Sequence, residues 1–359
     1  MKKILDTIYI AWIIGTKDIL DALKNKSSRA NIILMIGMVL FFYWLGVLRP
    51  FDKNVSVVFY NEGNTNLSLE EATLTSGSTY SFRKATSLQE METRMAYQNL
   101  GLVLPADFDQ TLASGSTPTL SGYIFWADRM KVVNLEAKYS QAITEILGQP
   151  VQVTIGKNIV IPKATAAGMP TTAASQMVYF VFSIALLLIP YLMLEEKQTR
   201  TLDALLTSPA SPGQVVLGKA MAGLFYVLVT GGLALALYSL YIVNWPLALA
   251  AFLGYALLAV GLGLVVGSFI KSAKQIGLWM VVLILFLVVP PFFYMEPSLK
   301  AGIKMVLTWF PSSTLASLFR FACSTGVTPA QILPNLAITI VSIGLAFGLV
   351  IWKVRRSDR

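Results

Sequence analysis

The chain has 359 residues, of which 55% are hydrophobic and only 13% are charged, against about 25% charged residues in an ordinary soluble domain. This composition excludes an ordinary soluble enzyme and indicates a protein embedded in a membrane. The sequence contains no histidine and a single cysteine, Cys323, so His-dependent triads and Cys/His metal centres are excluded, and we expect no catalytic residues and no metal site.

The N-terminal segment, residues 1–29, has the pattern of an amphipathic helix. Apolar Ile8 and Trp12 recur at helical spacing, whereas the polar Asp6 and Lys17 fall on other faces. We expect this helix to lie along the cytosolic surface of the membrane, with an ordinary cytosolic helix as the alternative.

Six segments are apolar over about 20 residues, the length that a helix needs to cross the hydrocarbon with its backbone groups bonded internally. They are approximately residues 30–48, 175–194, 216–241, 247–270, 276–295 and 333–352. The sequence therefore predicts an α-helical polytopic membrane protein with six transmembrane helices.

The Lys and Arg residues beside these segments predict the orientation, because positive residues in short loops stay in the cytosol. They precede the first segment and follow the second, fourth and sixth: Lys24, Lys26, Arg29, Lys197, Arg200, Lys271, Lys274, Lys353, Arg355, Arg356 and Arg359. Both termini are therefore expected in the cytosol. The net charge of +9 then reflects topology, and we expect no nucleic-acid partner.

Residues 49–174 form the one sizeable region outside these segments, and their pattern predicts an extracellular α/β domain inserted between the first two spans. Strands are expected at 55–60, 100–104 and 123–126, a hairpin at 151–161, and helices at 88–97 and 131–147. Ser87 and Glu90 are expected to form a capping box for the first of these helices. The carboxylates Asp107 and Asp109 are expected to be solvated surface groups rather than an acid–base pair.

The stretch Gly213–Ala220, GQVVLGKA, nearly matches a phosphate-binding loop. However, Ala220 stands where such a loop needs Ser or Thr for magnesium, and no strand precedes the stretch. Ser211 as a helix N-cap and Pro212 at the first helical position explain the sequence structurally. We therefore expect no nucleotide site on this chain.

The predicted spans contain almost no ionisable residues, which argues against a proton-driven carrier. Lys219 lies near the start of the third span and is expected to extend to the interface, and Glu296 lies at the outer end of the fifth. Sodium coupling stays open, because hydroxyl and carbonyl oxygens can hold sodium without charged residues.

The densest charged patch lies between the second and third spans, at about residues 195–210. Glu196 and Arg200 are one helical turn apart and can pair, while Leu202, Leu205 and Leu206 share one face of a short helix. A cytosolic helix with this apolar face suits the groove of a partner protein, and a loop on the membrane surface is the alternative.

The same patch carries a family resemblance. The stretch LEEKQTRTLDALLTSPASPGQVVLGK, residues 194–219, resembles the signature of the type-2 ABC exporter permeases, in which paired Glu residues precede Thr-Leu, Leu-Leu, Pro and Leu-Gly-Lys. The stretches VSVVFYNEG and LGLVLPADFDQTLASG are similar to the extracellular segment of the drug- and sodium-exporter-like branch of that family.

The resemblance implies a permease subunit that binds no cofactor of its own. It implies a second permease subunit, identical or paralogous, and two ABC ATPase subunits that bind ATP and magnesium, all among the lipids of the bacterial cytoplasmic (inner) membrane. It also implies a surface for coupling to the ATPase subunits, made by Glu195, Glu196, Arg200, Leu202, Leu205 and Leu206.

The segment between the fifth and sixth spans has the features of a gate. Pro290 and Pro291 interrupt the fifth span, and residues 303–332 are too apolar for an ordinary outer loop. We expect this segment to re-enter the membrane and to form an outer gate with Trp309, Phe310 and Pro311; interfacial packing is the alternative.

Ala259, Gly263 and Gly267 form a small-residue stripe on the fourth span, which suits close helix contact or the seam of a permease dimer. Aromatic and aliphatic spans without buried charge favour an amphipathic or lipid-like cargo such as a drug, an antibiotic or a lipid. The sequence thus predicts the permease subunit of an ATP-driven exporter, which is not itself an enzyme. The alternatives are a sodium-exporting ABC permease and a membrane-tethered receptor or adhesion protein outside the ABC class.

Overall fold

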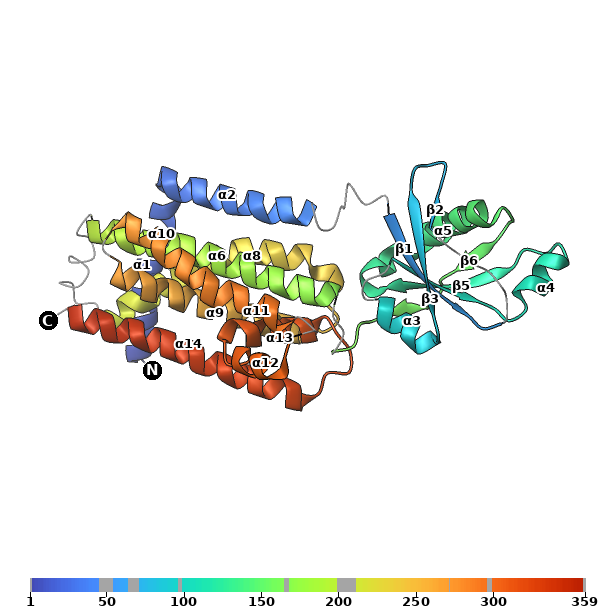
Figure 1. Cartoon of the computed structure of the whole chain (residues 1–359). Helices are drawn as coiled ribbons and strands as arrows, with labels where there is room; N and C mark the ends of the chain where they lie inside the picture. The colour runs from blue at the N-terminus through green and yellow to red at the C-terminus, as the bar shows by residue number, and fades with distance from the viewer. Residues whose placement is uncertain are drawn as a thin grey trace. The chain divides into compact units, whose positions relative to one another are not determined.

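A computed structural model describes residues 2–44, 54–63, 71–95, 99–164, 168–198, 211–270, 272–295 and 299–357. The chain divides into two units. The helical unit comprises Met1–Gly46, Thr171–Cys323 and Val327–Arg359, and the α/β domain comprises Val47–Pro170 and Ser324–Gly326. Figure 1 shows the elements of both units, which we describe one at a time.

Five segments of the described chain are long and apolar enough to cross a membrane, as predicted for the second to sixth spans. They are Pro170–Tyr191, Gly213–Leu237, Trp245–Phe269, Gln275–Tyr294 and Pro329–Arg356. The predicted first span, residues 30–48, differs. The apolar stretch of helix α2, Lys26–Tyr43, is Ser28–Phe41, shorter than the roughly 20 residues that a crossing needs, and residues 45–48 lie outside the described ranges.

Helices α6, Met169–Gln198, and α9, Trp245–Phe269, are the most buried spans of the helical unit. Helix α8, Pro212–Leu237, packs against α9 and against α1, Lys2–Lys24. Helix α14, Pro329–Ser357, also packs against α9. In Figure 1, α2 lies along one edge of the helical unit and α14 along the opposite edge.

The fifth span is irregular close to Pro290 and Pro291. Helix α10, Ala273–Leu283, continues through a π-helical turn, Ile284–Val288, into α11, Val289–Tyr294. Proline has no N–H to donate and its ring crowds the preceding turn, so the regular hydrogen-bond ladder cannot continue here. Two shorter helices precede α14: α12, Ala301–Leu307, and α13, Pro311–Ala322.

The α/β domain is built on a mixed sheet with the strand order β2-β3-β1-β4-β5-β6. The strands are β1 Asn54–Asn61, β2 Ala72–Thr73, β3 Thr79–Ala85, β4 Leu100–Leu104, β5 Thr119–Phe125, β6 Gln152–Thr154 and β7 Ile159–Val160. The helices are α3 Leu88–Arg94, α4 Phe108–Ala113 and α5 Val132–Leu147. Strand β1 pairs in parallel with β3 and β4, with Val57 opposite Phe82 and Leu100, whereas β4 and β5 are antiparallel.

Helices cover both faces of this sheet, because successive residues of a strand point to opposite sides. Val57 belongs to one core with Ile143 of α5, and Val58 belongs to another with Met91 of α3. A strand that is buried on both faces needs an almost continuous apolar sequence, which VSVVFY in β1 provides.

The predicted strands and helices of this domain are present, but two details differ. Ser87 caps α3 by accepting a hydrogen bond from the Glu90 N–H, whereas the Glu90 carboxylate accepts from Thr86 rather than from Ser87. The segment 151–161 is not a hairpin, because β6 and β7 each pair in parallel with β5. The crossover through α5 returns the chain to the start of β5, so both strands run along β5 in the same direction.

Candidate functional site

The elbow, residues 199–210, joins α6 to α8. It contains the predicted coupling residues Arg200, Leu202, Leu205 and Leu206, which lie outside the described residues. The backbone of the other two, Glu195 and Glu196, lies in the last turn of α6, which ends at Gln198. The structure therefore describes the two helices that the elbow joins, and the coupling surface itself stays a prediction.

Helix α8 begins at a strongly capped position, as predicted. The Ser211 side chain accepts from the Gln214 N–H at 3.3 Å, and the Gln214 side-chain oxygen accepts from the Ser211 N–H at 2.7 Å. Pro212 occupies the first turn, where a missing N–H costs nothing. The Gln214 side chain also donates to Thr7 Oγ1 of α1 at 3.4 Å, so the start of α8 is tied to α1.

A buried ion pair holds α1 against α8. The Lys219 Nζ lies 3.4 Å from Asp18 Oδ2, with the two side chains 6% and 9% exposed. The expectation that Lys219 extends to the interface is therefore wrong, because α1 covers it and supplies a carboxylate. Charges removed from water are tolerated only when they are paired and hydrogen-bonded, and this pair offsets the burial of both residues. Asp18 also lies 4.0 Å from the half-exposed Lys17.

Two glycines let α1 and α8 approach closely beside this pair. A Cβ atom added at Gly218 would lie 2.7 Å from Ile14 Cβ, and one added at Gly15 would lie 3.0 Å from the Gly218 carbonyl oxygen. The first distance is too short for a Cβ atom, and the second is tighter than nearly all Cβ contacts. The close crossing gives a physical reason for the Leu-Gly-Lys sequence at 217–219. Gly218 leaves room for α1 to approach, and Lys219 forms the ion pair with Asp18 of α1.

Helix α1 has three different faces. Ala11, Ile14, Gly15, Asp18 and Ala22 are buried. Seven large apolar residues are instead exposed, each by more than 40%: Leu5, Ile8, Tyr9, Trp12, Ile13, Leu20 and Leu23. Lys17 and Asp21 form an exposed ion pair at 3.7 Å on the third face. The helix predicted over residues 1–29 is thus present, and its position along a membrane surface stays a prediction.

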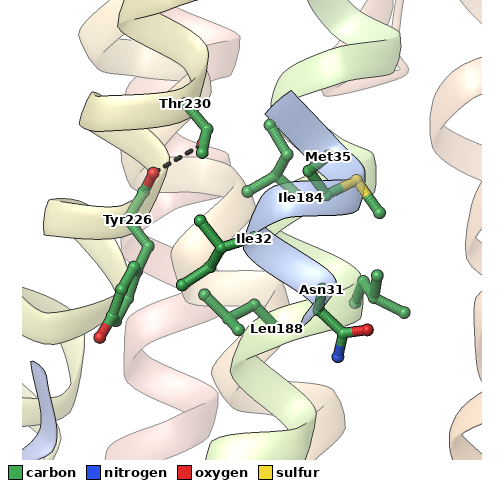
Figure 2. Close-up of a pocket in the computed structure, with 8 residues that line it drawn as sticks. Asn31, Ile32, Met35, Ile184, Leu188, Tyr226 and Thr230 are labelled. Carbon is green, nitrogen blue, oxygen red and sulfur yellow. Dashed lines mark hydrogen bonds between the residues drawn. The ribbon is translucent and has the colours of Figure 1, made fainter. Parts of the chain in front are cut away.

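Four helices meet in one apolar cluster a few turns from the elbow. Ala22 of α1, Leu188 of α6 and Tyr226 of α8 are buried there, and Ile32 of α2 packs against them. The Tyr226 hydroxyl donates to the carbonyl oxygen of Ile19 in α1 at 2.6 Å. Helices α6 and α8, which the elbow joins, therefore share this cluster with α1 and α2, and Figure 2 shows Ile32, Leu188 and Tyr226 in it.

The predicted small-residue stripe of α9 packs against α6 of the same chain. Ala259 is fully buried. An added Cβ at Gly263 would lie 3.0 Å from the Ala185 carbonyl oxygen, and one at Gly267 would lie 2.8 Å from Met193 Cβ. This face of α9 is filled by α6, so it is not open to a second permease subunit.

The C-terminal ends of α6, α9 and α14 gather where α8 begins. Gly267 places the end of α9 beside Met193 near the end of α6. The Lys353 ammonium of α14 lies 5.1 Å from the centre of the Phe269 ring at the end of α9. The basic end of α14, with Lys353, Arg355 and Arg356, thus lies beside the end of α9.

The predicted gate residues occupy different environments. Pro290 and Pro291 are buried in α11, which packs against α13. Pro311 starts α13 and is half-buried like Phe310 before it, whereas Trp309 is 71% exposed. The helix that carries the two buried prolines thus packs against α13, whereas Trp309 just before α13 is largely exposed. The role of these residues as a gate stays a prediction.

The remaining candidate residues, Asp107, Asp109 and Cys323, do not come together in a functional site. Asp107 and Asp109 are both exposed beside α4, as expected for solvated carboxylates. Cys323 is fully buried at the end of α13. Sequence reasoning missed Asp18 as a functional residue; the available signal was its helical spacing from Ala11 and Gly15, two small residues on the same face of α1.

Comparison with known proteins gives one family. A family model for ABC-2 family transporter proteins matches residues 30–352, which include the α/β domain, the elbow, four of the five long apolar helical segments and most of the fifth, Pro329–Arg356. No curated protein matches the chain.

Proposed function

Because this chain belongs to the ABC-2 family of transporter membrane proteins, we propose that it is one permease half of an ATP-driven exporter of amphipathic or lipid-like small molecules. It is a multi-pass membrane permease. Permeases of this family pair with ABC ATPase subunits and lack a nucleotide-binding site of their own. The family leaves no support for a receptor or adhesion protein outside the ABC class.

In this proposal, two ATPase subunits act on the elbow and on Glu195 and Glu196 beside it. The observation that carries the proposal is the bracing of the elbow end: Lys219 of α8 is ion-paired with Asp18, and Tyr226 is bonded to Ile19. A flexible attachment would absorb a displacement before it reached the spans. The bonded junction of α1, α2, α6 and α8 would transmit it.

The proposed orientation places the elbow and both termini in the cytosol and the α/β domain outside. The gathering of Lys353, Arg355 and Arg356 at the elbow end supports it, because basic residues flanking spans favour the cytosolic side. The exposed apolar residues of α1, including Tyr9 and Trp12, would then lie in the inner leaflet, where aromatic side chains favour the interface.

Sodium is the second candidate cargo, and buried hydroxyls favour it. Ser312 and Ser313 of α13 are fully buried, and within the described residues neither Oγ atom has a hydrogen-bond partner. An unpartnered buried hydroxyl is costly unless a ligand or water satisfies it. Hydroxyl oxygens also suit a sodium ion, so these two residues would be the first to replace if sodium proves to be the cargo.

Copurification tests the proposed function. We expect the tagged chain, extracted from its native membrane in mild detergent, to bring down an ABC ATPase whose hydrolysis rises when its cargo is added. Amphipathic compounds and sodium chloride, with potassium chloride as the matched salt, are added separately to identify the cargo. Recovery of the folded permease without any ATPase, at every detergent concentration that keeps it soluble, would contradict the proposal.

A further inference from the structure

A backbone bridge joins two segments of the α/β unit that lie far apart in the sequence. Residues 162–164 follow β7, whereas residues 324–326 lie between α13 and α14. Lys163 pairs in parallel with Thr325. The Thr325 N–H donates to the Pro162 carbonyl oxygen at 2.9 Å, and the Ala164 N–H donates to the Thr325 carbonyl oxygen at 3.2 Å. The α/β unit thus includes a piece of the connection between two helices of the other unit.

The residue at the end of α13 is bonded inside the helical unit. The Ala322 carbonyl oxygen accepts from the N–H groups of Val243 at 2.9 Å and Asn244 at 2.8 Å, and Asn244 is the N-cap of α9. A single residue, Cys323, separates Ala322 from Ser324, where the segment of the α/β unit begins. One residue of chain spans at most about 3.6 Å, so it can absorb little displacement.

Helix α13 is a part of the helical unit that cannot move alone. It is buried almost throughout, and it packs against α9, α14 and α11, the helix that carries Pro290 and Pro291. Protein interiors are close-packed, so a shift of a buried helix displaces its neighbours. A pull on the end of α13 would therefore reach the proline-interrupted part of the fifth span.

We infer that residues 162–164 and 324–326 form a clasp that couples α13 to the α/β domain. Along the chain, the domain is joined to the spans before β1 and after β7, and the clasp adds the turn between α13 and α14 as a further attachment. A displacement of the domain then acts on α13 as well as on its own linkers. The inference goes beyond the proposed function and requires neither an ATPase nor a cargo.

Cys323 can report on this clasp. It is the one cysteine of the 359-residue chain, it directly precedes the clasp, and it is fully buried. A buried thiol reacts only when the structure around it opens locally. The rate at which a maleimide labels the full-length chain in mild detergent therefore measures how often the end of α13 opens, and amide hydrogen exchange over α13 gives a second measurement.

Two proline variants break the clasp from opposite sides, because proline has no N–H to donate. T325P removes the donor to Pro162, and A164P removes the donor to Thr325. Each is expected to raise the labelling rate of Cys323 about fivefold, the effect of losing one backbone hydrogen bond, and to raise hydrogen exchange in α13. The midpoint of thermal unfolding should stay unchanged. A164P is the sharper test, since Ala164 belongs to the α/β domain and Cys323 does not.

Two control variants keep the clasp. T325A retains the backbone donor and acceptor of Thr325 and loses only the longer bond of its hydroxyl to Pro162, at 3.5 Å. T117P adds a proline at an exposed position before β5, whereas β7 pairs with the other end of that strand. Both controls are expected to label at the wild-type rate.

Wild-type labelling rates in folded T325P and A164P, or a rise in T117P as large as that in A164P, would overturn the inference. If one proline variant fails to fold, the other still decides the outcome. Copurification of the ATPase is measured separately, so a failure of the clasp leaves the proposed function standing, and a chain that binds no ATPase can still show the clasp.

Discussion

Replacing Asp18 by Asn, or Lys219 by Met, is expected to lower the free energy of unfolding of the helical unit by about 3–5 kcal/mol. D18N removes the carboxylate beside the buried Lys219 ammonium, and K219M leaves Asp18 with its longer, 4.0 Å contact to the half-exposed Lys17; the side chains of Asp18 and Lys219 are only 9% and 6% exposed. Thermal unfolding of the detergent-solubilised chain, followed by intrinsic tryptophan fluorescence, measures the loss.

Two further variants distinguish this ion pair from ordinary surface charge. The double variant D18N/K219M removes both charges and is expected to recover most of the stability, because a buried pair replaced by neutral groups leaves no uncompensated charge. D21N removes the carboxylate of the exposed Lys17–Asp21 pair and is expected to cost at most about 1 kcal/mol. An effect of D18N no larger than that of D21N would contradict the bracing role.

Reversing the charge of Glu195 and Glu196 together, as E195K/E196K, is expected to reduce export at least about tenfold, since like charges at an interface cost several kcal/mol. Both residues lie in the last turn of α6, at the edge of the elbow. The chain should still insert into the membrane, while the ATPase should lose its stimulation by cargo. Export and ATP hydrolysis are measured together in reconstituted vesicles.

The matched control reverses two exposed glutamates of the α/β domain, as E62K/E71K. This variant has the same change in net charge and is expected to retain export and stimulated hydrolysis. If E195K/E196K also retains both at the level of this control, the two glutamates take no part in coupling.

The features predicted correctly from the sequence are those that depend on neighbouring residues. An uninterrupted apolar run identifies a spanning helix by its length alone, and five of the six predicted spans have the required length in the structure. The start of α8 could also be predicted from the sequence, because Ser211, Pro212 and Gln214 form a local capping pattern. Strand β3 was missed because exposed Arg83 and Lys84 interrupt its apolar pattern.

The features that could not be predicted depend on contacts between residues that are far apart in the sequence. Asp18 and Lys219 are 201 residues apart, and each alone resembles a charged residue at a membrane surface. The parallel pairing of β7 with β5 likewise depends on the path of α5, not on the sequence of either strand.

The central claim is that work done by a partner ATPase enters through the elbow, and the location of the elbow tests it most directly. In the variant L205C, a membrane-impermeant thiol reagent is applied to intact cells and to inverted membrane vesicles. Cys323 contributes little background because it is fully buried. S114C, at an exposed position of the α/β domain, is the control for the opposite side.

We expect L205C to react in inverted vesicles and not in intact cells, with S114C showing the reverse, and we expect bound ATPase subunits to protect L205C. Reaction of L205C from outside intact cells would place the elbow on the far side of the membrane from ATP and would contradict the account.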